Sequence, residues 1–567
     1  MPNILKRLRN VSQQAVCGLA LSVASVCAAQ AAGMGVAQRG QFNGDCDALS
    51  ARLMNLANTT ISSSTPVAAG ALTLGGTPIP QHCLVTGAMF ERVSEVDGKP
   101  YAIRFEMRLP MQWNGRFFYQ ANGGIDGRVV PALGAAGGGP LTGALLQGFA
   151  VISSDAGHDG AMGADFGIDP QARLDYGYQA VGKLTPMAKQ LIEHAYGRPP
   201  DHSYIGGCSN GGRHTMIAMN RYSDAYDGYL AGAPGFRLPL AAIANIFGAQ
   251  RYASIATDPK DLSTAFTAAE RGMVADAVLA QCDALDGATD GLIQDVDACQ
   301  RAFDFDRDVP VCANERDGTC LTPAQKQALA PIFSGATTAD GTPFYAPFPY
   351  DAGLRGNGIP FWEFTAPVVM DSGGVALIWK VPPAPAAGFN GPAYALSTRI
   401  DDMLRGVAAT DARYTESAQQ FMMPPHPADL AALKQRGAKV MVYHGVSDPI
   451  FSVEDSKAWY EQMTAANGGD ATDFARFYRI PGMAHCAGGP ATDQFDLLSK
   501  LVAWVEQGQE PVSIVATARG PGNAGGVNDE IPAQWSAKRT RPLCAYPAVA
   551  RYKGAGSVED AANFECR

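Results

Sequence analysis

The chain has 567 residues, of which 47% are hydrophobic and 17% are charged, so it can bury a large core and is not of disordered composition. Its formal net charge is −10, and no dense run of Lys and Arg follows the first ten residues, which argues against a nucleic-acid partner. At roughly 100–200 residues per domain, the length predicts about two to four domains.

The first 31 residues have the organisation of a signal peptide. Three basic residues precede an apolar run over 15–28, and residues 29–31 (Ala-Gln-Ala) offer a cleavage site. A buried N-terminal helix and a lipid on Cys27 are the alternatives, the second opposed by bulky Val26. The run is too short to cross a bilayer, and no later stretch of about 20 apolar residues follows. We therefore expect a secreted or periplasmic protein without a membrane span.

Cysteine usage agrees with export. Removing Cys17 and Cys27 with the signal peptide leaves ten cysteines, and an even number in an exported chain predicts five disulfides. Local spacing favours the pairs Cys282–Cys299, Cys312–Cys320 and Cys544–Cys566. A zinc site is the alternative, but the sequence has no CxxC pair, and a His stands beside only two cysteines, Cys83 and Cys486, which are far apart in the chain.

Strand and helix patterns alternate through the first part of the chain. Strands are predicted over 101–107, 116–120, 149–154 and 203–205, and helices over 174–196 and 211–222. Such alternation is typical of a parallel α/β sheet. Residues 236–426 are instead rich in Pro, Gly and Asp, and strand patterns resume only at 439–443 and 475–480, before a helix over 493–506. We predict one sheet domain, residues 40–235 and 427–567, interrupted by an inserted domain, residues 236–426.

A G-x-S-x-G motif lies between the strand at 203–205 and the helix that follows. Gly207-Cys208-Ser209-Asn210-Gly211 would place Ser209 on a strained strand-to-helix turn, where flanking glycines avoid clashes and the helix N-terminus favours developing negative charge. A plain glycine turn is the alternative reading. The surrounding strand and helix favour a nucleophile.

An acid and a histidine follow Ser209 in the chain order that α/β-hydrolases use. Asp448 comes after strand 439–443, and His485 comes after strand 475–480. Of the eight histidines, only His485 follows the acid. A single loop Asp or His is usually a surface polar group, so order and strand position together select this pair. The long separation of Ser209 from Asp448 makes the insertion a candidate lid.

Two cysteines flank the proposed catalytic pair. Cys208 precedes Ser209 and Cys486 follows His485. If the serine and histidine are in hydrogen-bond contact, the two cysteines are near enough for a disulfide. Two unrelated structural cysteines are the alternative.

These residues resemble the tannase/feruloyl esterase family, whose catalytic residues have a Cys-Ser…Asp…His-Cys pattern. The resemblance covers about residues 40–567 and is weakest over about 336–425. It is carried by WNGRFF (113–118), FGIDPQARLDYGY (166–178), YDGYLAGAPG (226–235), CDALDGATDG (282–291), YHGVSD (443–448) and PGMAHCAGGPATDQFD (481–496). The implied fold is an α/β-hydrolase sheet domain with a large inserted lid domain.

The resemblance also implies site residues. It places the oxyanion hole at the backbone N–H groups of Gly124 and Asn210 and adds Cys46–Cys83 to the disulfides. It implies a structural calcium ion held by Asp283, Asp286 and Asp290 and by the carbonyls of Ala288 and Leu292. The three crowded carboxylates suit a hard cation, although surface Asp-Gly turns would explain them equally well.

Within the family the chain is most similar to enzymes that hydrolyse mono(2-hydroxyethyl) terephthalate, which hold the substrate carboxylate with a lid arginine. This chain has no Arg between Arg355 and Arg399, and Lys380 is the one cation there. We assign Trp379, Lys380 and His444 to the substrate pocket.

The predicted function is a serine esterase that acts on small aromatic-acid esters, with the terephthalate monoester as the alternative substrate and a non-catalytic binding protein as the alternative class. Its pocket would be roofed by residues 361–383, whose Phe361, Trp362, Phe364, Met370 and Trp379 suit an aromatic ring. The alternative is that these side chains only fill the core of the insertion.

Overall fold

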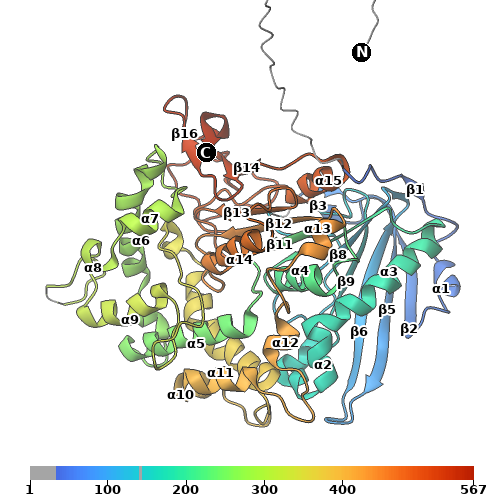
Figure 1. Ribbon diagram of the computed structural model, residues 1–567, viewed down its shortest axis with the longest axis horizontal. Helices are drawn as coiled ribbons and strands as arrows, with labels where there is room; N and C mark the ends of the chain where they lie inside the picture. The colour runs from blue at the N-terminus through green and yellow to red at the C-terminus, as the bar shows by residue number, and fades with distance from the viewer. Residues whose placement is uncertain (1–32, 140–142, 314) are drawn as a thin grey trace, which may run out of the picture.

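The computed structural model describes residues 33–139, 143–313 and 315–567 (Figure 1). The expected signal peptide and the lipidation alternative at Cys27 lie outside the described residues. Within them, no helix combines the length and the apolar character needed to cross a membrane.

A nine-stranded mixed sheet forms the centre of the molecule, in the order β13-β12-β11-β10-β8-β9-β6-β5-β2. Neighbours from β13 to β9 are parallel, and β6, β5 and β2 continue the sheet antiparallel. The strands are β2 (Thr59–Val67), β5 (His82–Val93), β6 (Pro100–Pro110), β8 (Arg116–Gln120), β9 (Ala150–Ser154), β10 (His202–Cys208), β11 (Gly228–Gly232), β12 (Lys439–Gly445) and β13 (Ala475–Ile480). Strands from both sides of the insertion thus join one sheet.

Helices cover both faces of the parallel half. They are α2 (Pro170–Leu174), α3 (Ala180–Tyr196), α4 (Asn210–Arg221), α14 (Val453–Ala466) and α15 (Leu497–Gln507). Alternate strand residues point to opposite faces. Tyr229 and Val442 therefore share a hydrophobic cluster with α3, α4 and α14, whereas Leu230 and Met441 share another with α15. Because both faces are covered, β11 and β12 are buried along their whole length.

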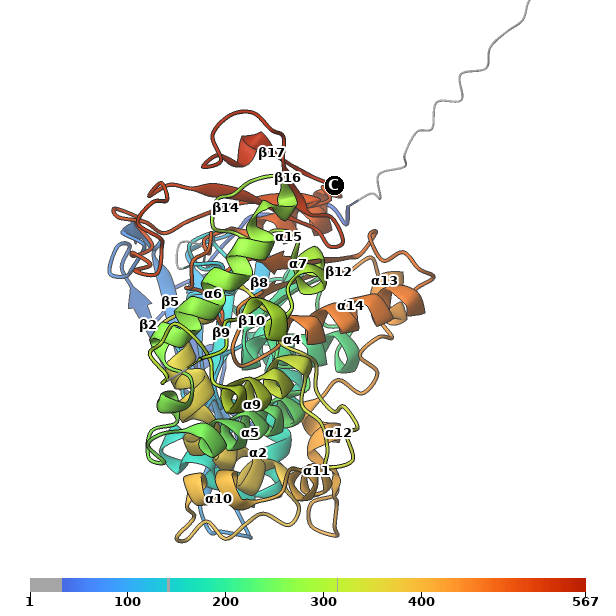
Figure 2. The same cartoon turned by 90° about the vertical axis from the view of Figure 1, so that its left-hand side faces the viewer.

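The chain between β11 and β12 is largely helical and has a hydrophobic cluster of its own. Its helices are α5 (Leu238–Ile255), α6 (Ala268–Cys282), α7 (Val296–Ala302), α8 (Phe305–Asp308), α9 (Pro323–Ser334), α10 (Gly391–Ser397), α11 (Ile400–Ala408), α12 (Ala418–Met422) and α13 (Ala431–Gln435). Figures 1 and 2 both show α5, α9, α10 and α11 gathered together, away from α15.

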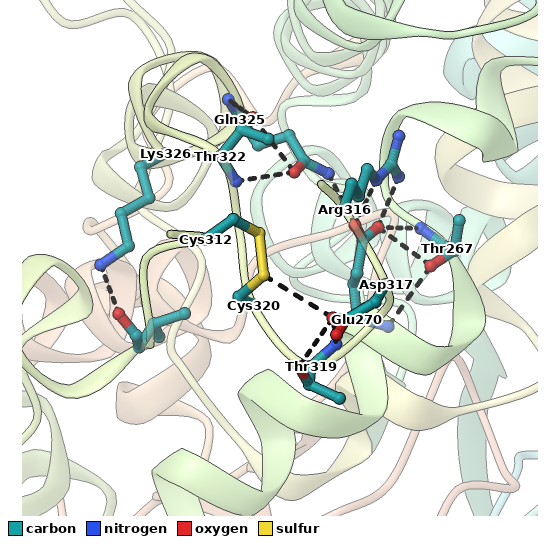
Figure 3. Close-up of a disulfide and its surroundings, with 11 residues drawn as sticks. Thr267, Glu270, Cys312, Arg316, Asp317, Thr319, Cys320, Thr322, Gln325 and Lys326 are labelled. Carbon is teal, nitrogen blue, oxygen red and sulfur yellow. Dashed lines mark hydrogen bonds and ion pairs between the residues drawn. A yellow bond between two sulfur atoms is a disulfide. The ribbon is translucent and has the colours of Figure 1, made fainter. Parts of the chain in front are cut away.

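One buried carboxylate joins three parts of this insertion. Glu270, which is fully buried at the start of α6, accepts hydrogen bonds from Arg316 and from Gln325 Nε2 of α9 (3.0 Å). Burial opposes its charge, but these donors keep the pKa of Glu270 below its ordinary value. Arg316 lies in the loop closed by the Cys312–Cys320 disulfide (Figure 3). The carboxylate therefore fastens this loop to both helices.

The C-terminal segment returns to the insertion. Strands β14 (Ser513–Thr517) and β15 (Thr540–Cys544) pair, as do β16 (Ala550–Tyr552) and β17 (Phe564–Cys566). Arg539 Nη1 donates to the Asp290 carbonyl oxygen (2.7 Å), Arg541 pairs with the Asp290 carboxylate, and Arg551 Nη1 donates to the Leu285 carbonyl oxygen (3.0 Å).

The predicted elements are confirmed, with two adjustments. The helix expected over 174–196 is α2, a π-helical segment (Asp175–Gln179) and α3. The helix expected over 493–506 begins at Leu497, because the Asp496 side chain accepts a hydrogen bond from Ser499 N (2.9 Å) and caps it.

The five disulfides expected from the sequence are all present: Cys46–Cys83, Cys208–Cys486, Cys282–Cys299, Cys312–Cys320 and Cys544–Cys566. The Cys208–Cys486 bond joins residues 278 apart and ties the end of β10 to the loop after β13, whereas Cys312–Cys320 joins residues 8 apart.

Their loop lengths predict unequal contributions to stability. In the chain-entropy description, loss of the long-range Cys208–Cys486 bond costs about 5.6 kcal/mol and loss of Cys312–Cys320 about 2.5 kcal/mol. We expect the Cys208→Ser/Cys486→Ser variant to unfold at lower denaturant concentration than Cys312→Ser/Cys320→Ser, the matched control. Denaturant unfolding of both variants and of the unsubstituted protein measures this. Equal destabilisation would contradict the loop-length argument.

Candidate active site

Ser209 occupies a sharp turn between β10 and α4. Its backbone has φ 66° and ψ −127°, a conformation that non-glycine residues rarely adopt. A Cβ on Gly207 or Gly211 would lie 2.2 or 2.3 Å from the Ala121 carbonyl oxygen, so both positions require glycine. Ser209 N donates to the Gly232 carbonyl oxygen (3.0 Å), which ties the turn to the end of β11.

A continuous hydrogen-bonded chain joins Ser209, His485 and Asp448. His485 Nε2 lies 2.8 Å from Ser209 Oγ, and His485 Nδ1 lies 2.8 Å from Asp448 Oδ2. Asp448 is buried at the end of β12, and its Oδ1 accepts from the backbone N–H groups of Ile450 (3.0 Å) and Phe451 (3.1 Å). The structure thus brings together the three residues selected from the sequence.

A second histidine supports the acid. His444 Nε2 lies 3.2 Å from Asp448 Oδ2 and 2.9 Å from the Phe451 carbonyl oxygen, while its Nδ1 contacts Ser456 Oγ (2.8 Å). Burial raises the pKa of Asp448, but the contacts with His485 and His444 outweigh it and hold this pKa well below its ordinary value. His444 is completely buried behind the acid. Its ring nitrogens thus contact protein groups, and the assignment of His444 to the substrate pocket stays a prediction.

The loop after β8 places a second set of backbone donors beside Ser209. A Cβ on Gly123 would lie 3.6 Å from Ser209 Cβ, and Gly124 has a positive φ of 66°. The N–H groups of Gly124 and Asn210 make no hydrogen bond to any group in residues 33–139, 143–313 or 315–567. Both amides are therefore free to donate to an oxygen near Ser209.

A buried polar network links the two sides of this donor pair. Asp126 Oδ2 accepts from Asn210 Nδ2 (2.8 Å) and from His214 Nε2 (2.9 Å), and Asn210 Oδ1 accepts from Arg213 Nε (2.5 Å). Burial and the adjacent Arg213 lower the pKa of His214, and Asp126 opposes this shift. The network was not predicted from the sequence. Its one local signal is the i, i+3, i+4 spacing of Asn210, Arg213 and His214 on α4.

Aromatic rings flank the histidine. The rings of Trp362 and Phe451 lie 5.2 and 5.4 Å from the His485 ring, both in edge-to-face geometry. Phe364, from the stretch expected to roof the pocket, instead packs on Tyr252 in the core of the insertion. Phe361 is about half exposed.

The other two expected substrate-binding residues have different surroundings. Trp379 is buried and packs against Gly374. Lys380 Nζ donates to the Pro382 carbonyl oxygen (2.9 Å), and its side-chain carbons lie against Gly406 of α11. The structure does not join either residue to the Ser209–His485 pair.

The proposed calcium ligands cluster in the loop that follows α6. Asp283 accepts from the N–H groups of Asp290 (3.1 Å) and Gly291 (2.9 Å), and Asp286 Oδ1 accepts from Ala288 N (2.9 Å). Burial and the two neighbouring carboxylates raise the pKa of Asp286 to about 7. Its buried Oδ2 contacts no donor in the described part of the chain.

The donor chemistry of this loop fits a hard cation, since it offers three buried carboxylates and one free carboxylate oxygen. Arg541, however, engages the Asp290 carboxylate. Across the described ranges, no group of three or more His, Cys, Asp or Glu side chains is arranged to hold a metal ion.

Comparisons with known proteins agree with this geometry. The mono(2-hydroxyethyl) terephthalate hydrolase of Piscinibacter sakaiensis is 38% identical over 87% of this chain and 86% of its own. A probable feruloyl esterase B-1 of Neosartorya fischeri is 29% identical over 81% and 82% of the two chains. The structure of feruloyl esterase B from Aspergillus oryzae superposes with a TM-score of 0.73, at 25% identity, over 92% of this chain and 99% of that one.

The fold shared with that structure is of the α/β-hydrolase type. A family profile described as tannase and feruloyl esterase matches residues 83–567, most of the described sheet and the whole insertion. The chain therefore belongs to the tannase and feruloyl esterase family of carboxylic ester hydrolases.

Proposed function

We propose that Ser209, His485 and Asp448 are the catalytic residues of this esterase. The observation that carries the proposal is the unbroken chain of two 2.8 Å hydrogen bonds from Asp448 through His485 to Ser209. The strained backbone at Ser209 supports it, because such strain is retained where it serves a site.

The reaction proceeds through an acyl-serine. Ser209 Oγ attacks the ester carbonyl carbon while His485 Nε2 takes its proton, and Asp448 holds Nδ1 and stabilises the imidazolium. His485 then protonates the leaving alcohol. Water, deprotonated by the same nitrogen, releases the acid and restores Ser209. The N–H groups of Gly124 and Asn210 stabilise the oxyanion of each tetrahedral intermediate.

The insertion between β11 and β12 is the proposed lid. Its Trp362 lies against His485, so it reaches the catalytic residues from outside the sheet. We assign the acyl side of the pocket to this segment and to Phe451. An aromatic acyl group suits these rings, because aromatic rings pack favourably against one another.

The proposed substrate is an ester of a small neutral aromatic acid, such as a hydroxycinnamate or benzoate. Two features support it: the segment between Arg355 and Arg399 has no arginine, and Lys380 already donates to Pro382. Loss of a bidentate arginine removes a strong contact with a substrate carboxylate. The similarity to a terephthalate monoester hydrolase keeps that monoester as the second candidate.

We also propose that the protein is exported and binds structural calcium. Five disulfides suit an oxidising compartment. The proposed ligands of Ca²⁺ are Asp283, Asp286 and Asp290 with the carbonyls of Ala288 and Leu292. The ion would offset the repulsion among three buried carboxylates.

The Ser209→Ala variant tests the mechanism. We expect kcat on a small aryl ester to fall by about 10⁴- to 10⁶-fold, because the acyl-serine cannot form. Ser254→Ala, which alters an exposed serine on α5, is the control and should match the unsubstituted enzyme. Wild-type turnover in Ser209→Ala would refute the assignment, and binding of aryl esters without turnover by the unsubstituted protein would favour the non-catalytic alternative.

The substrate assignment predicts a preference between two esters. We expect kcat/KM to be higher for methyl ferulate than for mono(2-hydroxyethyl) terephthalate, by about 10- to 150-fold, the value of one missing charged hydrogen bond. Lys380→Ala should leave the ratio unchanged, because Lys380 is bonded to Pro382. A wild-type preference for the monoester that this substitution abolishes would make Lys380 the carboxylate anchor.

Chelation tests the calcium proposal. A ligand present at 100 times its Kd stabilises the folded state by about 2.7 kcal/mol, so EDTA should lower the melting temperature. The Asp286→Asn variant should melt at the temperature of the EDTA-treated unsubstituted protein, whether or not EDTA is present. Purified protein that contains no calcium by elemental analysis and melts identically with EDTA would exclude the site.

A further inference from the structure

A carboxylate of the insertion contacts both loops that carry the acid and the base. Asp351, just before the short helix Ala352–Arg355, is 1% exposed. Its Oδ1 accepts from Ser447 Oγ (2.9 Å) and from Gly482 N (3.2 Å). Ser447 precedes Asp448, and Gly482 lies three residues before His485. One oxygen atom thus serves as the acceptor for both loops.

The backbone beside this carboxylate fits closely against the same loops. A Cβ on Gly353 would lie 2.2 Å from Ser447 Oγ and 3.1 Å from the Gly482 carbonyl oxygen. Ser447 N also donates to the Met483 carbonyl oxygen (3.0 Å), so the two loops contact each other where Asp351 joins them. Little space remains for the loops to shift while Asp351 is in place.

Asp351 also lines a small cavity whose walls are mostly apolar. Among the described residues, Asp351 Oδ2 accepts no hydrogen bond and Arg271 Nε donates none. Both residues line a cavity of about 30 Å³ that also touches Glu363 and the back of Asp448. The cavity has room for about one water molecule, and its walls offer both a donor and an acceptor. Burial raises the pKa of Asp351 to about 6.

We propose that Asp351 is a positioning residue that fixes the acid and base loops relative to each other, so that the insertion sets the geometry of the catalytic residues. The inference rests on the proposed function of Ser209, His485 and Asp448. Without this carboxylate, Ser447 Oγ and Gly482 N lose a buried acceptor, and the loops move to find other partners. A displacement of about 1 Å at a catalytic group costs about 10²-fold in rate.

Two substitutions at Asp351 separate positioning from stability. Asp351→Ala removes the acceptor, whereas Asp351→Asn keeps a carbonyl oxygen for both donors and removes only the charge. We expect Asp351→Ala to lower kcat on an aryl ester by about 10- to 100-fold with KM changed less than about twofold, and Asp351→Asn to restore kcat to within about fivefold of wild type.

Glu270→Ala is the matched control, because Glu270 is also a fully buried carboxylate of the insertion but bonds to Arg316, Gln325 and Thr267. It should lower the melting temperature and leave kcat unchanged. A loss of kcat in Glu270→Ala equal to that in Asp351→Ala would reduce Asp351 to a structural role and overturn the inference.

A second measurement does not depend on the choice of ester. The rate at which a fluorophosphonate labels Ser209, followed by intact mass, reports the Ser209–His485 pair directly, and Asp351→Ala should slow it by the same factor as kcat. Equal labelling rates in wild type and Asp351→Ala would overturn the inference while leaving the proposed function intact. No labelling of Ser209 in the wild type would overturn the proposed function and the inference with it.

Discussion

The positive-φ backbone at Ser209 is the constraint on which the rest of the site depends. A side chain can project from so sharp a turn only if its neighbours lack side chains, and Gly207 and Gly211 meet this need against Ala121. The same turn starts α4 at Asn210, whose backbone N–H is one of the two proposed oxyanion donors. The loop that carries Gly124 and the loop that carries His485 both contact this turn at Ser209.

Periodicity predicted the parallel half of the sheet well, because its strands are short apolar runs bounded by turns. It missed β11, whose Gly-Tyr-Leu-Ala-Gly sequence has weak strand propensity and is a strand because β10 and β12 pair with it on both sides. It also missed β2, where Ser and Thr dominate an edge strand that is half exposed. Strands β11 and β2 both form because they pair with other strands of the sheet, and a local sequence pattern does not contain this information.

The proposed catalytic residues, which the structure joins by hydrogen bonds, could be selected from the sequence because their chain order and their positions after strands can be read from it. The contact of His444 with the acid, 3.2 Å from His444 Nε2 to Asp448 Oδ2, was not predicted from the sequence. Asp126 and Asp351 carried no signal, since each acts on residues about 84 and 96 positions away. Contacts of that kind depend on how the loops meet.

The arginines of the C-terminal segment impose an order on assembly. Arg539, Arg541 and Arg551 satisfy carbonyl and carboxylate groups in the loop after α6, in the middle of the chain. Until residues 539–551 have emerged and folded, that loop keeps unpaired buried acceptors and crowded negative charge. The loop after α6 therefore completes these hydrogen bonds and ion pairs only when the C-terminal segment has folded against it.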